Sequence, residues 1–144
     1  MLIGQHKHTL DTKKRLSLPA KFRKELGKTV VITKGLDSVI FLYSQKEWKK
    51  FSENVSDLSM GQSDTRAFSR HFLGGASEVD IDSAGRILIP DFLKDLAQLD
   101  SKVMVVGMVS RIELWDEERW NKSQADFNQK ADIVAEKLGE IGVI

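Results

Sequence analysis

Two stretches of the sequence match position by position: LDTKKRLSLP at residues 10–19 and IDSAGRILIP at residues 81–90. Aspartate, arginine and proline hold the same places in both, and Pro19 and Pro90 are the only prolines of the chain. The match continues at an offset one residue larger, up to the pair formed by Trp48 and Trp120. Because turn, charge, proline and aromatic positions repeat together, the sequence predicts a tandem duplication.

Each copy has the same local pattern. An extended segment meets a polar turn, a second extended segment follows, and proline opens a short helix, where its fixed φ and missing N–H are tolerated. Two further strands come next, and a closing helix is opened by a capping box of Ser44 and Glu47 in the first copy and by Asp116 in the second. The expected extended segments are 6–10, 15–18, 29–33 and 39–43, then 78–81, 86–89, 103–106 and 112–115, with short helices at 20–26 and 91–96.

One copy alone has too little apolar surface for a core, so we expect the two copies to pack as a pseudo-twofold pair in an α+β fold. Phe68 and Phe72, four residues apart and followed by Gly74 and Gly75, indicate a helix between the copies. The expected organisation is a first repeat at 1–55, a connecting helix at 56–75, a second repeat at 76–121 and a C-terminal helix at 122–144.

The C-terminal segment has an apolar stripe at helical spacing, formed by Phe127, Ala131, Val134, Leu138 and Ile141. Amphipathic helices usually cover the core of their own chain, and we favour that role here. Contact with a neighbouring subunit is the alternative.

The composition restricts the class of protein. The 144 residues include no cysteine, which excludes disulfides and thiolate metal sites. The chain begins with no signal pattern, and no apolar run approaches the roughly 20 residues that span a bilayer. We therefore expect a soluble cytoplasmic protein without a membrane partner.

Charge is distributed unevenly along the chain. The net charge is only +1, but residues 1–34 carry nine basic residues against two acidic ones, a local net charge of +7. The rest of the chain must then carry −6. This asymmetry favours a basic face for a polyanion, while a solvated surface without a partner is the alternative interpretation.

The two polar turns are the candidate functional sites. Asp11 and Asp82 can accept hydrogen bonds from backbone N–H groups two or three residues further on, and Gly85 can supply a positive φ, so these three residues are predicted to form the turns. Three cations crowd the first turn, and one aspartate cannot neutralise them. Arg15, together with Lys13 and Lys14 at the same turn, is therefore predicted to bind a polyanion. In the alternative interpretation, the arginines only form salt bridges with the aspartates.

Several motifs resemble the MraZ family. They are the doubled Asp-x-x-Gly-Arg pattern, HTLDTKKRLSLPAKFR at residues 8–23, GGASE at residues 74–78 and IELWD at residues 112–116. The resemblance covers residues 3 to 120. It implies an AbrB-like swapped-hairpin β-barrel with flanking helices, ring-shaped homo-oligomers and double-stranded DNA binding through the two turns. The family's basic turn positions fall on Lys13, Arg15 and Arg86, so the predicted DNA-binding residues are Lys13, Lys14, Arg15 and Arg86. The resemblance also implies a transcriptional regulator at the nucleoid, which binds short tandem direct repeats in the promoter of the division and cell-wall gene cluster, including its own.

The chain departs from the family pattern at two positions. Lys14 stands where the family usually has glycine, so the first turn is expected to be strained or shaped differently. Ala84 stands where the first turn has Lys13, so the first turn is expected to dominate DNA contact.

Other functions are less well supported by the residues. A ring-forming scaffold or an antitoxin-like protein-interaction module is the main alternative. No motif indicates an enzyme, a cofactor or a small-molecule substrate. His6, His8 and Asp11 lack a further ligand at metal-site spacing, so no metal site is expected. His71 and the three tryptophans, Trp48, Trp115 and Trp120, are interpreted as packing residues, with base stacking as the alternative for the tryptophans.

Overall fold

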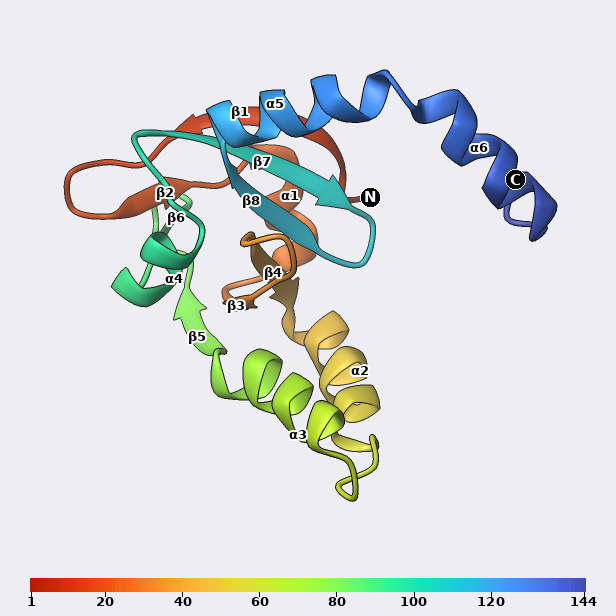
Figure 1. Cartoon of the computed structure of the whole chain (residues 1–144). Coiled ribbons are helices and arrows are strands. Elements are labelled where there is room, and N and C mark those ends of the chain that lie inside the picture. The colour runs from red at the N-terminus through yellow and green to blue at the C-terminus, as the bar shows by residue number, and fades with distance from the viewer.

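The computed structural model describes all 144 residues as an α+β fold (Figure 1). Along the chain, the first copy contains β1 (Ile3–Thr9), β2 (Arg15–Ser17), α1 (Ala20–Leu26), β3 (Thr29–Lys34), β4 (Ile40–Ser44) and α2 (Gln45–Ser56). A helix α3 (Ser63–Ser69) and a π-helical turn η1 (Arg70–Gly74) follow. The second copy contains β5 (Ser77–Asp80), β6 (Arg86–Leu88), α4 (Asp91–Leu96), β7 (Lys102–Met108), β8 (Ile112–Asp116) and α5 (Glu117–Asn128), and α6 (Ala131–Glu140) ends the chain.

The two copies exchange strands. A six-stranded antiparallel sheet has the order β1-β7-β8-β4-β3-β5, so the first strand of each copy pairs with the third strand of the other. The fourth strands, β4 and β8, pair with each other at the centre, and so do the short strands β2 and β6 in a separate ribbon. Every pairing thus has its counterpart when the copies are interchanged, as the predicted pseudo-twofold pair requires.

The strand pairings do not close into the barrel that the resemblance implies. The six-stranded sheet ends at β1 and β5, and the β2–β6 ribbon forms a separate two-stranded sheet. The turn after Leu10 interrupts the ladder, and a single bridge between Leu10 and Leu16 connects β1 with β2. The observed architecture is an open sheet facing a ribbon.

The main core fills the space between the sheet, the ribbon and the helices α1 and α4. Leu16, Leu18 and Phe22 from the first copy meet Ile87 and Leu93 from the second, and all five are at most 1% exposed. A second, aromatic cluster lies under α2 and η1, with Phe41, Tyr43 and Phe72 buried. Both copies contribute to one core, as the expected packing of the two copies requires.

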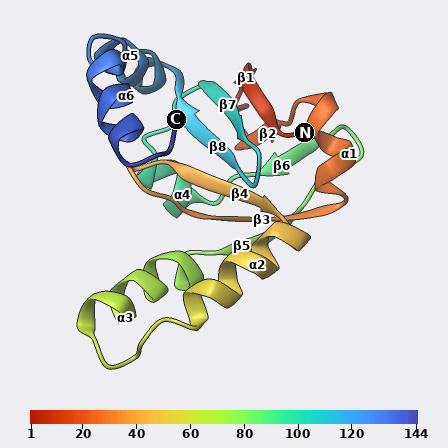
Figure 2. The same ribbon diagram turned by 90° about the vertical axis from the view of Figure 1, so that its right-hand side faces the viewer.

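The segment between the copies is less helical than expected. The sequence predicted a helix over 56–75, but α2 extends to Ser56, residues 57–62 form a loop, and only residues 63–74 are helical. Asp57, Ser59 and Gly61 make up half of this loop, and these residue types favour turns because their side chains or free φ compete with helical hydrogen bonds. The two helices form a hairpin that projects from the body (Figures 1 and 2).

The C-terminal stripe does not cover the core of its own chain, so the favoured interpretation was wrong. The helical segment is interrupted at Gln129–Lys130, between α5 and α6, and α6 projects away from the body of the molecule (Figure 1). No residue of α6 is buried, and Ile133 and Ile141 are 59% and 72% exposed. The break separates Phe127 from the rest of the stripe, because residues across it no longer share one helical face. No helix is long and apolar enough to cross a membrane.

Candidate nucleic-acid interface

The first turn is built around the carboxylate of Asp11. Its Oδ1 accepts hydrogen bonds from the backbone N–H groups of Lys13 and Arg15, both at 2.9 Å. Its Oδ2 accepts from Nε of Arg15, also at 2.9 Å. The backbone N–H of Lys14 donates to the carbonyl of Asp11 at 3.0 Å and closes the turn.

The second turn repeats this geometry around Asp82. Oδ1 accepts from the N–H groups of Ala84 and Arg86, and Oδ2 accepts from Nε of Arg86, all at 2.9 Å. Gly85 closes the turn with a 2.9 Å hydrogen bond to the Asp82 carbonyl. Asp11, Asp82 and Gly85, which the sequence singled out as turn-forming, lie at these two turns.

Lys14 and Gly85 adopt the same left-handed conformation, with φ of 62° and 78°. Both are fixed by a hydrogen bond from the other copy: the N–H of Ile89 donates to the Lys14 carbonyl at 2.8 Å, and the N–H of Leu18 donates to the Gly85 carbonyl at 2.9 Å. Of the two expectations for Lys14, a different shape or strain, the structure supports strain, because a side chain at positive φ costs roughly 1–2 kcal/mol.

Hydrogen bonding keeps both turn aspartates ionised. Mainly because the backbone N–H of Arg15 donates to it, the pKa of Asp11 lies below its ordinary value of 3.8. The N–H of Arg86 lowers the pKa of Asp82 in the same way. Each arginine gives only Nε to its aspartate. The outer edge of each guanidinium, which suits bidentate binding, is therefore available to a ligand.

Both arginines lie on the outward face of the β2–β6 ribbon. Leu16 and Ile87 form its central pair and point into the core, so the residues on either side of them point outward. Arg15 pairs with Leu88, and Arg86 pairs with Ser17, which places the arginines diagonally near opposite ends of the ribbon. A two-stranded ribbon of this kind fits the major groove of B-DNA.

The lysines of the first turn differ in their partners. The ammonium group of Lys14 forms an ion pair with Asp91 of the other copy, so part of its charge is compensated. Lys13 is exposed and enters none of the ion pairs of the chain. Among the predicted lysines, Lys13 is thus the better placed for a phosphate.

Arg23, on α1, is a residue of this surface that the sequence analysis did not single out. Its guanidinium lies against Gly85, where a β-carbon would overlap it, and its Nε donates to the Leu18 carbonyl at 3.0 Å. The second turn therefore has a companion cation, although Ala84 supplies none. Only the strand exchange brings Arg23 there, and no spacing in the sequence indicates it.

The histidines and tryptophans are in packed positions. The ring of His6 meets Phe22 edge to face at 5.1 Å, and Nε2 of His71 lies 2.7 Å from the Gly35 carbonyl. Trp48 packs on Tyr43, and Trp115 and Trp120 meet edge to face at 5.4 Å. No group of three or more histidine, aspartate or glutamate side chains is placed to hold a metal ion.

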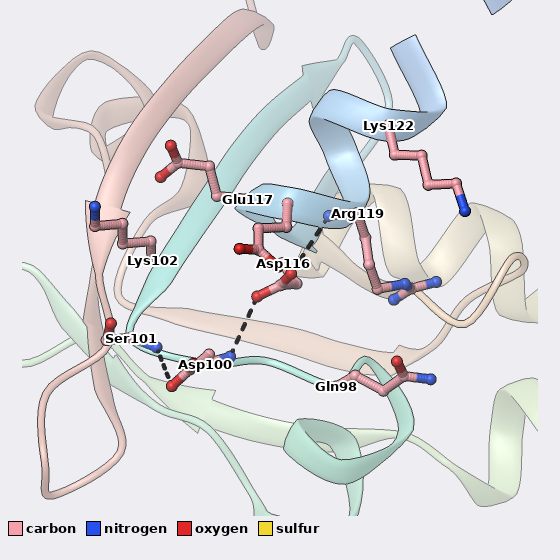
Figure 3. Close-up of a pocket in the computed structure, with 9 residues that line it drawn as sticks. Gln98, Asp100, Ser101, Lys102, Asp116, Glu117, Arg119 and Lys122 are labelled. Atoms are coloured by element: carbon pink, nitrogen blue, oxygen red, sulfur yellow. Dashed lines mark hydrogen bonds between the residues drawn. The ribbon is translucent and has the colours of Figure 1, made fainter. Parts of the chain in front are cut away.

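A polar hollow beside the start of α5 is shown in Figure 3, and no residue of either turn lines it. It has a volume of about 700 Å³ and no hydrophobic lining residue. Its carboxylates have structural roles: Asp116 accepts from the N–H of Arg119 at 3.3 Å at the start of α5, and Asp100 accepts from the N–H of Ser101 at 2.9 Å. The arrangement serves helix and turn capping.

Strand exchange and matching Asp–Arg turns define a duplicated α+β protein that presents a cationic β-ribbon. Comparison of the sequence with family models gives the specific assignment. The chain belongs to the MraZ family, because the model described as "MraZ protein, putative antitoxin-like" matches residues 1–71 and again residues 72–138.

Curated relatives match along nearly their whole length. A protein of Caldicellulosiruptor saccharolyticus is 45% identical over 99% of this chain and 100% of its own. One of Alkaliphilus oremlandii is 43% identical over 99% and 100%, and one of Caldanaerobacter subterraneus subsp. tengcongensis is 43% identical over 97% and 95%. All three are named "Transcriptional regulator MraZ".

Proposed function

We propose that this protein is a sequence-specific DNA-binding transcriptional regulator. The observation that carries the proposal is the pair of arginines on the outward face of one ribbon, each held at Nε by its own aspartate. The names of the relatives support the same function.

In this mechanism, affinity and sequence preference come from different side chains. Lys13 neutralises phosphate and releases counterions, which gives affinity without sequence preference. The free edges of Arg15 and Arg86 bind guanine O6 and N7 in the major groove, which gives sequence preference. The aspartates hold the arginines in place and keep their side chains from folding onto phosphates.

The proposed DNA is a set of short tandem direct repeats in the promoter of the division and cell-wall gene cluster, including the protein's own gene. This part rests on the resemblance to the family, as do the proposed cytoplasmic location at the nucleoid and the relation to AbrB-like swapped-hairpin barrels. The strand exchange between the copies supports that last relation.

We also propose that the protein forms a ring-shaped homo-oligomer. Ile133 of α6 and the apolar residues Ile141, Val143 and Ile144 after it are exposed, and a second copy is the partner that is always present at the same concentration. One subunit offers few base contacts, whereas linked subunits on regularly spaced repeats gain affinity through effective concentration, by a factor on the order of 10²–10⁴.

A gel-shift titration with the promoter of the gene cluster tests the function. Wild-type protein is expected to bind a duplex with several repeats far more tightly than a duplex with one, and the gain should vanish when roughly 5 base pairs are inserted between repeats, because the second site moves to the opposite face of the duplex. Arg15→Ala should weaken binding by about 1–3 kcal/mol per engaged subunit. Unchanged binding by a folded Arg15→Ala oligomer contradicts the proposed site.

A protein-interaction module remains the second candidate, favoured by the hollow between α2 and α3. Phe41, Phe51 and Phe68 line this hollow, which has a volume of about 400 Å³. Binding to DNA that is weak and independent of the number of repeats supports this candidate instead of the regulator.

A further inference from the structure

Arg23 belongs to the first copy but lies at the turn of the second. Its Nε donates to the carbonyl of Leu18, and its guanidinium occupies the space that a side chain on Gly85 would need. Gly85 directly precedes Arg86, so the two guanidinium groups approach the same end of the ribbon from different copies of the repeat.

No carboxylate neutralises Arg23. It enters none of the ion pairs of the chain, and the carboxylate of this turn, Asp82, is bound to Arg86. His8 lies nearby, and the charge of Arg23 helps to lower the pKa of His8, after burial and the charge of His6. A half-buried cation without an acidic partner is unfavourable, and an anion supplied by a ligand would compensate it.

We propose that Arg23 is a DNA-phosphate contact that completes the second turn. The inference rests on the proposed DNA-binding function and adds to it a residue outside both turn motifs. Its partner is the phosphate backbone. The hydrogen bond from Nε to Leu18 holds Arg23 at the end of the ribbon, and when a ribbon is inserted into a groove of DNA, the phosphates that border the groove lie beside this end. Arg86, on the outward face, is left to contact the bases.

Each end of the ribbon then has one arginine of a turn and one companion cation. The first end combines Arg15 with Lys13, which comes from its own turn, and the second combines Arg86 with Arg23, which comes from the other copy. From the sequence, we expected the first turn to dominate DNA contact because Ala84 is not a lysine. This expectation counted only the cations within each turn.

The test compares Arg23→Ala with Lys24→Ala, an exposed neighbour on α1 that removes the same charge. Anisotropy titrations use the full-length protein, a promoter duplex and a mixed-sequence duplex of equal length. Arg23→Ala is expected to weaken binding to both duplexes about tenfold and to shallow the log–log salt dependence by roughly 0.9 per engaged subunit. Lys24→Ala should change neither quantity appreciably, and Arg23→Lys should retain the salt dependence.

Gly85→Ala provides a second route to the same site. Its new methyl group displaces Arg23, so its loss of affinity should match that of Arg23→Ala, and the double variant should lose no more than either single one. Thermal unfolding confirms that each variant is folded. If Arg23→Ala and Lys24→Ala bind DNA with equal affinity while Arg15→Ala weakens binding, the role of Arg23 is overturned and the proposed DNA-binding function is not. A loss confined to the promoter duplex overturns the phosphate assignment. Failure of wild type to bind either duplex overturns the proposed function and the inference with it.

Discussion

Lys14 and Gly85 show how one backbone conformation is obtained from two very different residues. Both have positive φ, and both carbonyls accept a hydrogen bond from the other copy. The side chain of Lys14 makes the conformation costly, and its ion pair with Asp91 is exposed to solvent and returns little stability.

Lys14→Gly is therefore expected to raise the free energy of unfolding by about 0.5–1 kcal/mol. This is the strain that is relieved, reduced by the larger conformational entropy that glycine loses on folding. Urea unfolding followed by tryptophan fluorescence measures the change. Lys13→Gly is the matched control, because Lys13 does not have positive φ, and it should not stabilise. A destabilised Lys14→Gly protein contradicts the assignment of strain.

The turn aspartates predict a specific dependence of stability on pH. A carboxyl group whose pKa is lowered in the folded chain contributes stability above its ordinary pKa of 3.8, and this contribution disappears as the pH falls through the folded value. The melting temperature of wild type should exceed that of the Asp82→Asn variant at pH 7, and the difference should shrink below pH 3.8. A difference that persists unchanged at pH 2.5 contradicts this account.

At the residue scale, local chemistry was readable from the sequence and contacts between the copies were not. The Asp–Arg turns follow from hydrogen bonds within five residues, so a motif predicts them. The contact of Arg23 with Gly85 and that of Lys14 with Asp91 join segments more than 60 residues apart, and no local pattern contains them.

At the scale of elements, the helices and strands that bury a face were predicted well. The short helices α1 and α4 begin after proline and bury Phe22 and Leu93, as expected. The helices that bury little were predicted poorly: residues 57–62 form a loop, and α6 projects from the body. An apolar stripe indicates a helix, but it does not say which surface covers it.

Removal of residues 130–144 tests the role of α6. Because α6 contributes no buried residue, the truncated protein should unfold within a few degrees of wild type, while its mass by light scattering should fall to that of a smaller assembly. Lys137→Ser, on the polar part of the same helix, is the control and should keep the wild-type mass. An assembly of unchanged mass assigns the subunit contact to another surface.

At the scale of the whole molecule, strand exchange makes the two copies inseparable. Each copy completes the sheet of the other, and the side chain of Arg119 in the second copy donates to the carbonyls of Asp37 and Ser38 in the first, both at 2.7 Å. The sequence predicted that the copies pair, because one copy alone has too little apolar surface for a core, whereas the exchange of strands was implied only by the resemblance to the MraZ family.

A fragment of residues 1–75 should therefore not exist as a folded monomer. Its β3 lacks the partner β5, and its β1 lacks β7, so it should be either unfolded or paired with a second fragment. Circular dichroism and light scattering distinguish these states, with a mixture of fragments 1–75 and 76–144 as the control that should restore the native signal. A folded monomer of residues 1–75 would show that the exchange is dispensable.

The ribbon has one more consequence, which concerns polarity. Its two ends differ, because Leu88 stands beside Arg15 where Ser17 stands beside Arg86, and lysine serves one end where arginine serves the other. A duplex laid along the ribbon therefore meets a surface that has a head and a tail, although the backbone is nearly symmetric. Each bound subunit therefore has a defined orientation along the double helix. Subunits joined by head-to-tail contacts share one orientation. They would therefore bind DNA elements that all have the same orientation and would not match inverted repeats.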